Sequence, residues 1–206
     1  MHIDLTEMLR CPEPHEEGFL VMSTGEMRGR MVRSGVLGCP VCGREFAILK
    51  GVVQFSGSRE QGAGPGTAAG GPAPRSPLPG AETLQALLDL SGPGGYVVLL
   101  GSAARHAVGL AGLMGGIHFI GIDAPPDVEE LPVLSLVACD TMIPLRRTMA
   151  RAVVVGRDRA EPAWLVEAHR ILLPGRRLVV ERDDVTLPPG LTRVASGQGL
   201  LVAERR

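Results

Sequence analysis

The sequence predicts an α/β protein: a small β-rich module followed by a reduced, Rossmann-like doubly wound sheet. From residue 81 onward, short and nearly continuous apolar runs alternate with helical or turn segments, as a sheet covered on both faces requires. The first 56 residues hold short strand-like runs, and three of the four cysteines stand within the first 42 residues. We therefore divide the chain into a module over 1–56, a linker over 57–80 and an α/β domain over 81–206.

The linker is predicted from composition alone. Between the two patterned regions the sequence is rich in Gly, Pro, Ala and Ser and has almost no large apolar side chain. Such a segment cannot bury enough surface to offset the entropy lost on ordering.

Each element of the α/β domain has its own signal. The stretch AETLQALLDLSG places Leu84, Leu87 and Leu88 on one helical face, ended by Gly92. A second helix and a turn are predicted for AWLVEAHRILLPG, and the closing LTRVASGQGLLVAERR favours an antiparallel hairpin. The buried strands are expected in YVVLLG, IHFIGID, VLSLVACD, ARAVVVGRD and RRLVVERDD.

Composition and charge exclude several classes of protein. The net charge of -1 and pI of about 6.5 do not give the broad basic footprint of a protein that grips nucleic acid. No apolar run approaches the roughly 18 residues that span a bilayer, and the N-terminus has no basic segment followed by an apolar one. We predict a soluble, cytoplasmic protein without a membrane partner.

Four residues form a candidate metal site: Cys11 and His15 in CPEPH, and Cys39 and Cys42 in CPVCG. A Cys-x2-Cys turn directs two thiolates at one ion, and a second pair completes a tetrahedral site. All four positions are then filled, so the predicted zinc is structural. Two free thiol pairs, one of them redox-active, are the alternative; Glu13 or His2 could also replace His15 as the fourth ligand.

The N-terminal module resembles the small zinc-ribbon proteins that activate tRNA and release-factor methyltransferases. The resemblance lies in LTEMLRCP, GVLGCPVCG and REFAILKGVVQF and covers about the first 55 residues. It departs from that family in having His15 where a second cysteine is typical. It implies a ribbon that stabilises a methyltransferase, as a partner protein or as a fused domain.

Residues 81–206 resemble a class I S-adenosylmethionine-dependent methyltransferase in reduced form. VVLLGSA, HFIGIDAPP, ACDTMIPL, ARAVVVGRD and LVEAHRILLPGRRLVVERD follow one another in the order of that family's motifs. The resemblance implies that Gly101 lies in the cofactor loop, that Asp123 holds the ribose and that Asp140 lies beside the adenine. Both aspartates could instead be turn residues that end buried strands.

The cofactor loop departs from the family pattern. The family would have an acid at Leu99 and glycines at Ala103 and Arg105, which let the backbone approach the ligand closely. We expect Arg105 to project into the place of the ligand's methionine half, or to reach an anion there. Only a short segment separates Asp123 from the next strand, which is too little for a crossover helix.

The other reactive side chains have simpler interpretations. His106 and His118 are predicted to be structural, His169 to lie on a helix surface and Cys139 to be a small buried side chain. Trp164 is expected to pack a helix onto the sheet. Two basic stripes could contact RNA but are predicted to be solvated surface: Arg28, Arg30 and Arg33, and Arg146, Arg147 and Arg151.

These observations favour a non-catalytic binding or scaffold protein with one zinc and a protein partner; no catalytic residue is assigned, and S-adenosylmethionine binding is doubtful. The alternative is an active methyltransferase acting on RNA or a small molecule. A nicotinamide-dinucleotide Rossmann domain is a third hypothesis, which the lone glycine of the loop disfavours.

Overall fold

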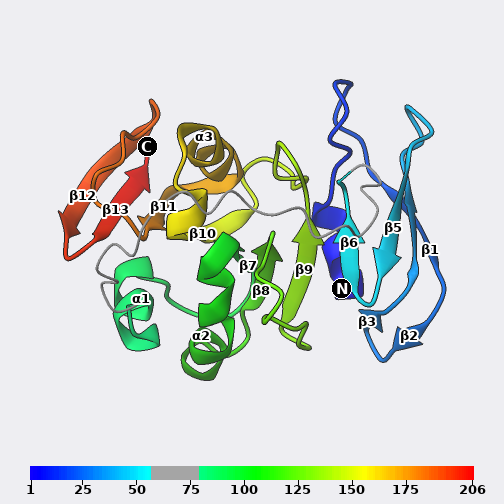
Figure 1. Ribbon diagram of the computed structural model, residues 1–206, viewed down its shortest axis with the longest axis horizontal. Coiled ribbons are helices and arrows are strands. Elements are labelled where there is room, and N and C mark those ends of the chain that lie inside the picture. Colours follow the sequence, from blue (N-terminus) through cyan, green and yellow to red (C-terminus); the bar gives the residue numbers. More distant parts are fainter. Residues whose placement is uncertain (57–78) are drawn as a thin grey trace.

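A computed structural model describes residues 1–56 and 79–206, which share one 11-stranded sheet (Figure 1). The strand order is β1-β4-β5-β6-β9-β8-β7-β10-β11-β13-β12. The strands of the N-terminal module are β1 (Val21–Thr24), β2 (Met27–Arg28), β3 (Met31–Val32), β4 (Gly35–Gly38), β5 (Glu45–Leu49) and β6 (Val52–Gln54). Strands β2 and β3 form a separate two-stranded sheet.

The α/β domain supplies the other strands. They are β7 (Tyr96–Leu100), β8 (His118–Ile122), β9 (Leu134–Ala138), β10 (Ala150–Val155), β11 (Leu172–Val180), β12 (Leu191–Gly197) and β13 (Leu200–Arg205). Strands β9, β8, β7, β10 and β11 are parallel neighbours. The α/β domain begins with the central strand β7 and continues outward through β8 to β9. The chain then returns to form β10 and β11 on the other side of β7, which is the doubly wound order.

Helices cover both faces of this sheet (Figure 1). Helices α1 (Ala81–Leu88) and α2 (Ala107–Leu113) cover one face, and α3 (Pro162–Ile171) covers the other. The 3-10 helices are η1 (Ile3–Met8), η2 (Gly101–His106) and η3 (Arg157–Arg159). The predicted fold class, a mixed α/β protein with a large and mostly parallel sheet, is confirmed.

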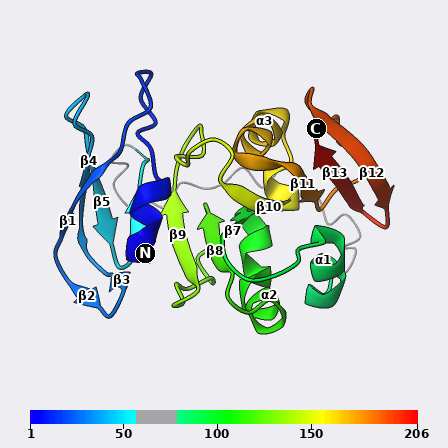
Figure 2. The same cartoon turned by 180° about the vertical axis from the view of Figure 1, so that it is seen from behind.

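The N-terminal module is part of the same sheet (Figure 2). Strand β6 pairs in parallel with β9, with Val53 opposite Val137. A second connection is an antiparallel bridge between Leu9 and Leu145. Both residues of the bridge are fully buried, and one apolar cluster runs from η1 and Val53 to α3. The proposed boundary near residue 56 is therefore not a break in the hydrogen-bonded sheet.

One sequence expectation changes in detail, and the predicted C-terminal hairpin is present. Strand β11 begins directly after α3, so the expected LLPG turn is an irregularity inside the strand, with Gly175 at φ 67°. The predicted closing hairpin is present as β12 and β13, joined through Gln198 and Gly199, both at positive φ, as a tight primed turn requires. Of the predicted linker, residues 57–78 lie outside the described residues.

The connection from β8 to β9 contains no helix, as its length predicts. A groove of about 410 Å³ lies there, lined by residues that include Arg105, Asp127, Val128 and Leu131. Among the helices described in 1–56 and 79–206, none is both long enough and apolar enough to cross a membrane.

Candidate functional site

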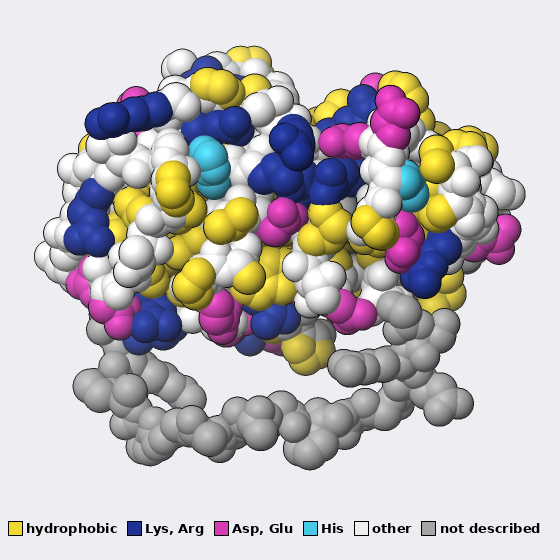
Figure 3. All heavy atoms as spheres, turned by 90° about the horizontal axis from the view of Figure 1, so that it is seen from above, with side chains coloured by type: hydrophobic (Ala, Val, Ile, Leu, Met, Phe, Trp, Pro, Cys, Tyr) yellow, Lys and Arg dark blue, Asp and Glu magenta, His cyan; other side chains and the backbone are white. Residues whose placement is uncertain are grey.

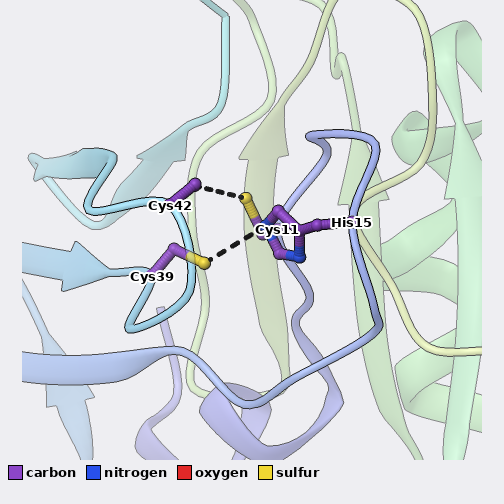
Figure 4. Close-up of side chains that lie close together, drawn as sticks. All are labelled: Cys11, His15, Cys39 and Cys42. Carbon is purple, nitrogen blue, oxygen red and sulfur yellow. Dashed lines mark hydrogen bonds between the residues drawn. The ribbon is translucent and has the colours of Figure 1, made fainter.

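Four side chains converge near the junction of the two parts of the chain (Figure 4). Cys11 and His15 follow η1, and Cys39 and Cys42 lie in the turn between β4 and β5. Their ligand atoms all lie within 4.8 Å of one another. Two segments separated by a long hairpin therefore bring all four predicted ligand residues to one point.

The CPVCG turn is shaped by its own backbone. The amide of Cys39 donates to the carbonyl of Arg44 at 2.8 Å, and the amide of Gly43 donates to the carbonyl of Cys39 at 2.9 Å. Gly43 has φ 71°, a conformation that glycine adopts without a steric penalty. This turn holds the Cys39 sulfur at the site.

The spacing of the ligand atoms fits a tetrahedral zinc ion. Zn–S bonds of about 2.3 Å and Zn–N bonds of about 2.0 Å imply an S···S separation of about 3.8 Å and an S···N separation of about 3.5 Å. The Cys11 and Cys42 sulfurs lie 3.7 Å apart, and the Cys39 sulfur lies 3.3 Å from His15 Nε2. His15 Nδ1 lies 2.7 Å from the carbonyl oxygen of Glu16. A hydrogen bond from Nδ1–H to that oxygen leaves the Nε2 lone pair for a metal.

The surroundings of the site shift the pKa values of Cys11 and Cys39 in opposite directions. Burial, with hydrogen bonds from Cys42 and Cys39, raises the pKa of Cys11 to about 12. Burial also acts to raise the pKa of Cys39, but hydrogen bonds from the Cys42 and Val41 amides outweigh it and lower that pKa to about 7. A divalent cation would displace these protons and neutralise the thiolates.

The alternative fourth ligands lie elsewhere. Glu13 forms an ion pair with Arg44 at 2.8 Å. The ring of His2 packs 5.0 Å from that of His118, and its Nδ1 accepts a hydrogen bond from the Asp4 amide. Neither belongs to the cluster that His15 completes.

The second candidate region is the carboxyl edge of the sheet, where β7 and β10 end side by side. Helix η2 follows β7 and η3 follows β10, so the two meet at the topological switch point, where such folds bind ligands. Gly101 has φ 58°, and a Cβ there would lie 2.5 Å from a carboxylate oxygen of Asp158 and 2.7 Å from Cγ of Arg159. The glycine is thus packed against protein side chains.

Asp158 binds the loop that a cofactor would bind. The Ser102 amide donates to Asp158 Oδ1 at 2.8 Å, and the Ser102 hydroxyl donates to the same oxygen at 2.5 Å. The carboxylate thereby satisfies an amide at the start of η2 that an anionic ligand could otherwise use. Asp158 was not identified from the sequence, although its place in the short segment that follows the apolar run of β10 was a usable signal.

Asp123 also has partners within the protein. It directly follows β8 and has φ 47°. Its Oδ1 accepts a hydrogen bond from the Cys139 amide at 2.8 Å, and its Oδ2 lies 3.5 Å from Arg159. Burial raises the pKa of Asp123, and the Cys139 amide and Arg159 oppose that shift. These contacts match the turn-residue interpretation. Asp140 is exposed at the end of the neighbouring strand.

Arg105 does not project into the loop, contrary to expectation. It forms a two-pronged ion pair with Asp127, with both N···O distances 2.8 Å. Asp127 lies in the connection from β8 to β9, where no helix stands in the way. Asp158, rather than Arg105, occupies the loop amide.

The histidines have structural contacts. His106 Nε2 lies 2.6 Å from Glu181, and both side chains are buried. His118 Nε2 lies 3.0 Å from the Ser135 hydroxyl, and burial lowers the pKa of His118 to about 4. His169 is half-buried on α3. Glu181 was not identified from the sequence.

Cys139 and Trp164 lie near Asp123 and Arg159. Cys139 is buried, its sulfur lies 3.8 Å from Asp123, and burial strongly raises the thiol pKa. Trp164 packs against the core, with the Arg159 guanidinium 5.4 Å from its ring.

Most arginines of the two basic stripes are engaged by neighbours. Arg28, Arg30 and Arg33 pair with Glu26, Asp4 and Glu130. Arg151 donates to four carbonyls of the loop before β7 and therefore does not extend a stripe with Arg146.

Comparisons with known proteins find structural similarity at low sequence identity. No family profile and no curated protein matches the sequence. A geranyl diphosphate methyltransferase solved with GPP and sinefungin is 14% identical, with a TM-score of 0.48, over 61% of this chain and 76% of that chain. The antibiotic-resistance methyltransferase Kmr is 15% identical, with a TM-score of 0.43, over 61% and 92%. A complex between the Haloferax volcanii Trm112 methyltransferase activator and a putative methyltransferase is 22% identical, with a TM-score of 0.39, over 48% and 50%.

The fold itself is assigned from the strand order, which is that of a mixed α/β protein with a doubly wound, Rossmann-like sheet.

Proposed function

We propose that this protein is a non-catalytic binding or scaffold protein that has a methyltransferase-like domain. The observation that carries the proposal is the Asp158 carboxylate on the Ser102 amide and hydroxyl. Asp123 supports it, because both of its oxygens already have partners in Cys139 and Arg159. S-adenosylmethionine would have to displace these internal contacts before it could bind in the usual place.

We further propose that Cys11, His15, Cys39 and Cys42 hold one structural zinc ion. The support is that two of their separations match the edges of a zinc tetrahedron and that all four ligand atoms lie within 4.8 Å of one another. A structural site with four protein ligands has no open position for a catalytic water. The described cysteines are all free thiols, which fits the proposed location in the reducing cytoplasm.

We also propose that a protein partner binds at an outer edge of the sheet. Within the chain, β6 covers the edge of β9, so the outer edges of the described sheet are β1 and β12. Phe19 and Val21, at the β1 edge, are 62% and 64% exposed. An unpaired edge flanked by apolar side chains is suited to strand addition by another protein.

Calorimetry tests the non-catalytic assignment. S-adenosylmethionine is titrated into the metal-loaded protein and, separately, into an Asp123→Ala variant. The proposal predicts no saturable heat at about 1 mM ligand, which places any binding free energy weaker than about -4 kcal/mol. Micromolar binding that Asp123→Ala abolishes would contradict the proposal and favour the active-methyltransferase alternative.

A further inference from the structure

The two parts of the chain present two arginines on one face of their junction. Around the Leu9–Leu145 bridge, the Arg10 amide donates to the Pro144 carbonyl at 3.0 Å, and the Arg146 amide donates to the Met8 carbonyl at 2.9 Å. Leu9 and Leu145 point into the core and are fully buried. Because side chains alternate along paired strands, Arg10 and Arg146 share the opposite face, diagonally across the pair.

Arg146 has donors without an acceptor. Within 1–56 and 79–206, its guanidinium has no hydrogen bond or ion pair, and its Nε is buried without a partner. Its Cζ lies 3.9 Å from the centre of the Phe19 ring. A guanidinium donates hydrogen bonds in its own plane, and a contact with a ring face does not supply an acceptor for those donors.

Arg10 is only partly satisfied. Its Nη1 lies 3.5 Å from Glu17, its Nη2 lies 3.6 Å from the Met142 sulfur, and its Nε is buried with no acceptor. Sulfur is a weak acceptor. Buried polar atoms are normally hydrogen-bonded. The Nε atoms of Arg10 and Arg146 are both buried without a partner, which points to an acceptor that the described residues do not supply.

A third arginine, Arg170, differs from these two because each nitrogen of its guanidinium has a hydrogen-bond acceptor. Arg170 binds both oxygens of Glu167 and also donates to the carbonyls of Ile143 and Leu145. Glu17 is the acid that pairs with Arg10, at 3.5 Å, and no acid forms an ion pair with Arg146 in the described residues. Figure 3, which looks down on the loops that carry these residues, shows Lys and Arg side chains gathered near the middle of the face.

We propose that Arg10 and Arg146 together bind a phosphate group at the junction of the two parts of the chain. Two guanidinium groups from different segments offer more donors than one carboxylate can accept, whereas a phosphate has at least two free oxygens and a delocalised negative charge. The group could be the free or terminal phosphate of a small molecule, or a phosphodiester of RNA. The site lies outside the cofactor region, so it does not depend on the proposed function.

Titration with two probes tests the site and separates the two sources. Inorganic phosphate is followed by calorimetry, and a fluorescent single-stranded oligoribonucleotide is followed by anisotropy over a range of salt concentrations, both with the full, metal-loaded chain. Arg146→Gln is expected to weaken binding about tenfold or more, and Arg146→Lys less, because lysine keeps the charge but loses the planar fork. Arg182→Gln is the matched control, since Arg182 is also partly exposed but already pairs with Asp184 at 2.7 Å.

Each outcome decides the proposal. Phosphate binding without RNA binding supports a small-molecule source. RNA binding whose logarithmic salt slope falls by about one in Arg146→Gln supports a backbone source. Melting temperatures of the variants establish that they are folded, and Arg146→Lys remains informative if Arg146→Gln is not. If neither probe binds, or if the Arg146 variants lose no more affinity than Arg182→Gln, the proposal is wrong.

Discussion

Replacing Asp158 by alanine removes the carboxylate that holds the loop after β7. Two hydrogen bonds are lost, one from the Ser102 amide at 2.8 Å and one from its hydroxyl at 2.5 Å. Buried hydrogen bonds to charged groups contribute about 1.5–3 kcal/mol each, but Asp158 is exposed and water replaces part of that. We therefore expect a loss of about 1–2 kcal/mol for the pair, which lowers the melting temperature by about 2–8 °C in a chain of this size.

The assay is urea unfolding followed by circular dichroism and by the fluorescence of Trp164, the only tryptophan. A double-mutant cycle with Ser102→Ala isolates the interaction and should give a coupling of about 0.5–1 kcal/mol. Asp184→Ala is the control. Asp184 is an exposed acid like Asp158, but its ion-pair partner is Arg182 rather than a residue of the loop after β7. If Asp158→Ala unfolds at the same urea concentration as Asp184→Ala, or the cycle shows no coupling, the carboxylate does not hold the loop.

Three further predictions concern the metal, the pH dependence and the junction. Cys39→Ser should lose the bound zinc and melt earlier, whereas Cys139→Ser, outside the cluster, should keep one ion per chain by metal analysis; equal metal content in both would contradict the site. Burial lowers the pKa of His118 to about 4 from 6.5, so the unfolded chain takes up its proton first as the pH falls. The contribution of His118 to stability should be complete above about pH 6.5 and be lost toward pH 4, by about 2 kcal/mol allowing for partial exposure, and His118→Gln should flatten that part of the urea-unfolding profile; an unchanged profile would refute this. Val53→Ala, at a fully buried position paired with Val137, should cost about 1–3 kcal/mol and shift the unfolding of the whole chain as one transition; separate transitions for the two parts would show that the β6–β9 pairing does not couple them.

Local sequence patterns predicted the elements, because each pattern has a local cause. The CPVCG turn carries its own glycine, and the apolar runs of β7 to β11 are what a doubly covered sheet demands. The pairing of β6 with β9 could not be predicted in this way, since an apolar strand does not encode which edge it joins.

The candidate cofactor region was predicted less well, because its side-chain contacts are tertiary. Arg105 pairs with Asp127 in the connection from β8 to β9, and the Ser102 amide binds Asp158, three residues beyond β10. Neither partner is adjacent in the sequence, so the local pattern located the unusual loop but did not predict these contacts.

The most direct test of the central claim is a crystal structure of the metal-loaded protein grown with S-adenosylmethionine in millimolar excess. We predict the Asp158 carboxylate on the Ser102 amide and hydroxyl, with no nucleoside density over Gly101. A nucleoside bound there, with Asp158 turned away and Asp123 on its ribose, would contradict the account.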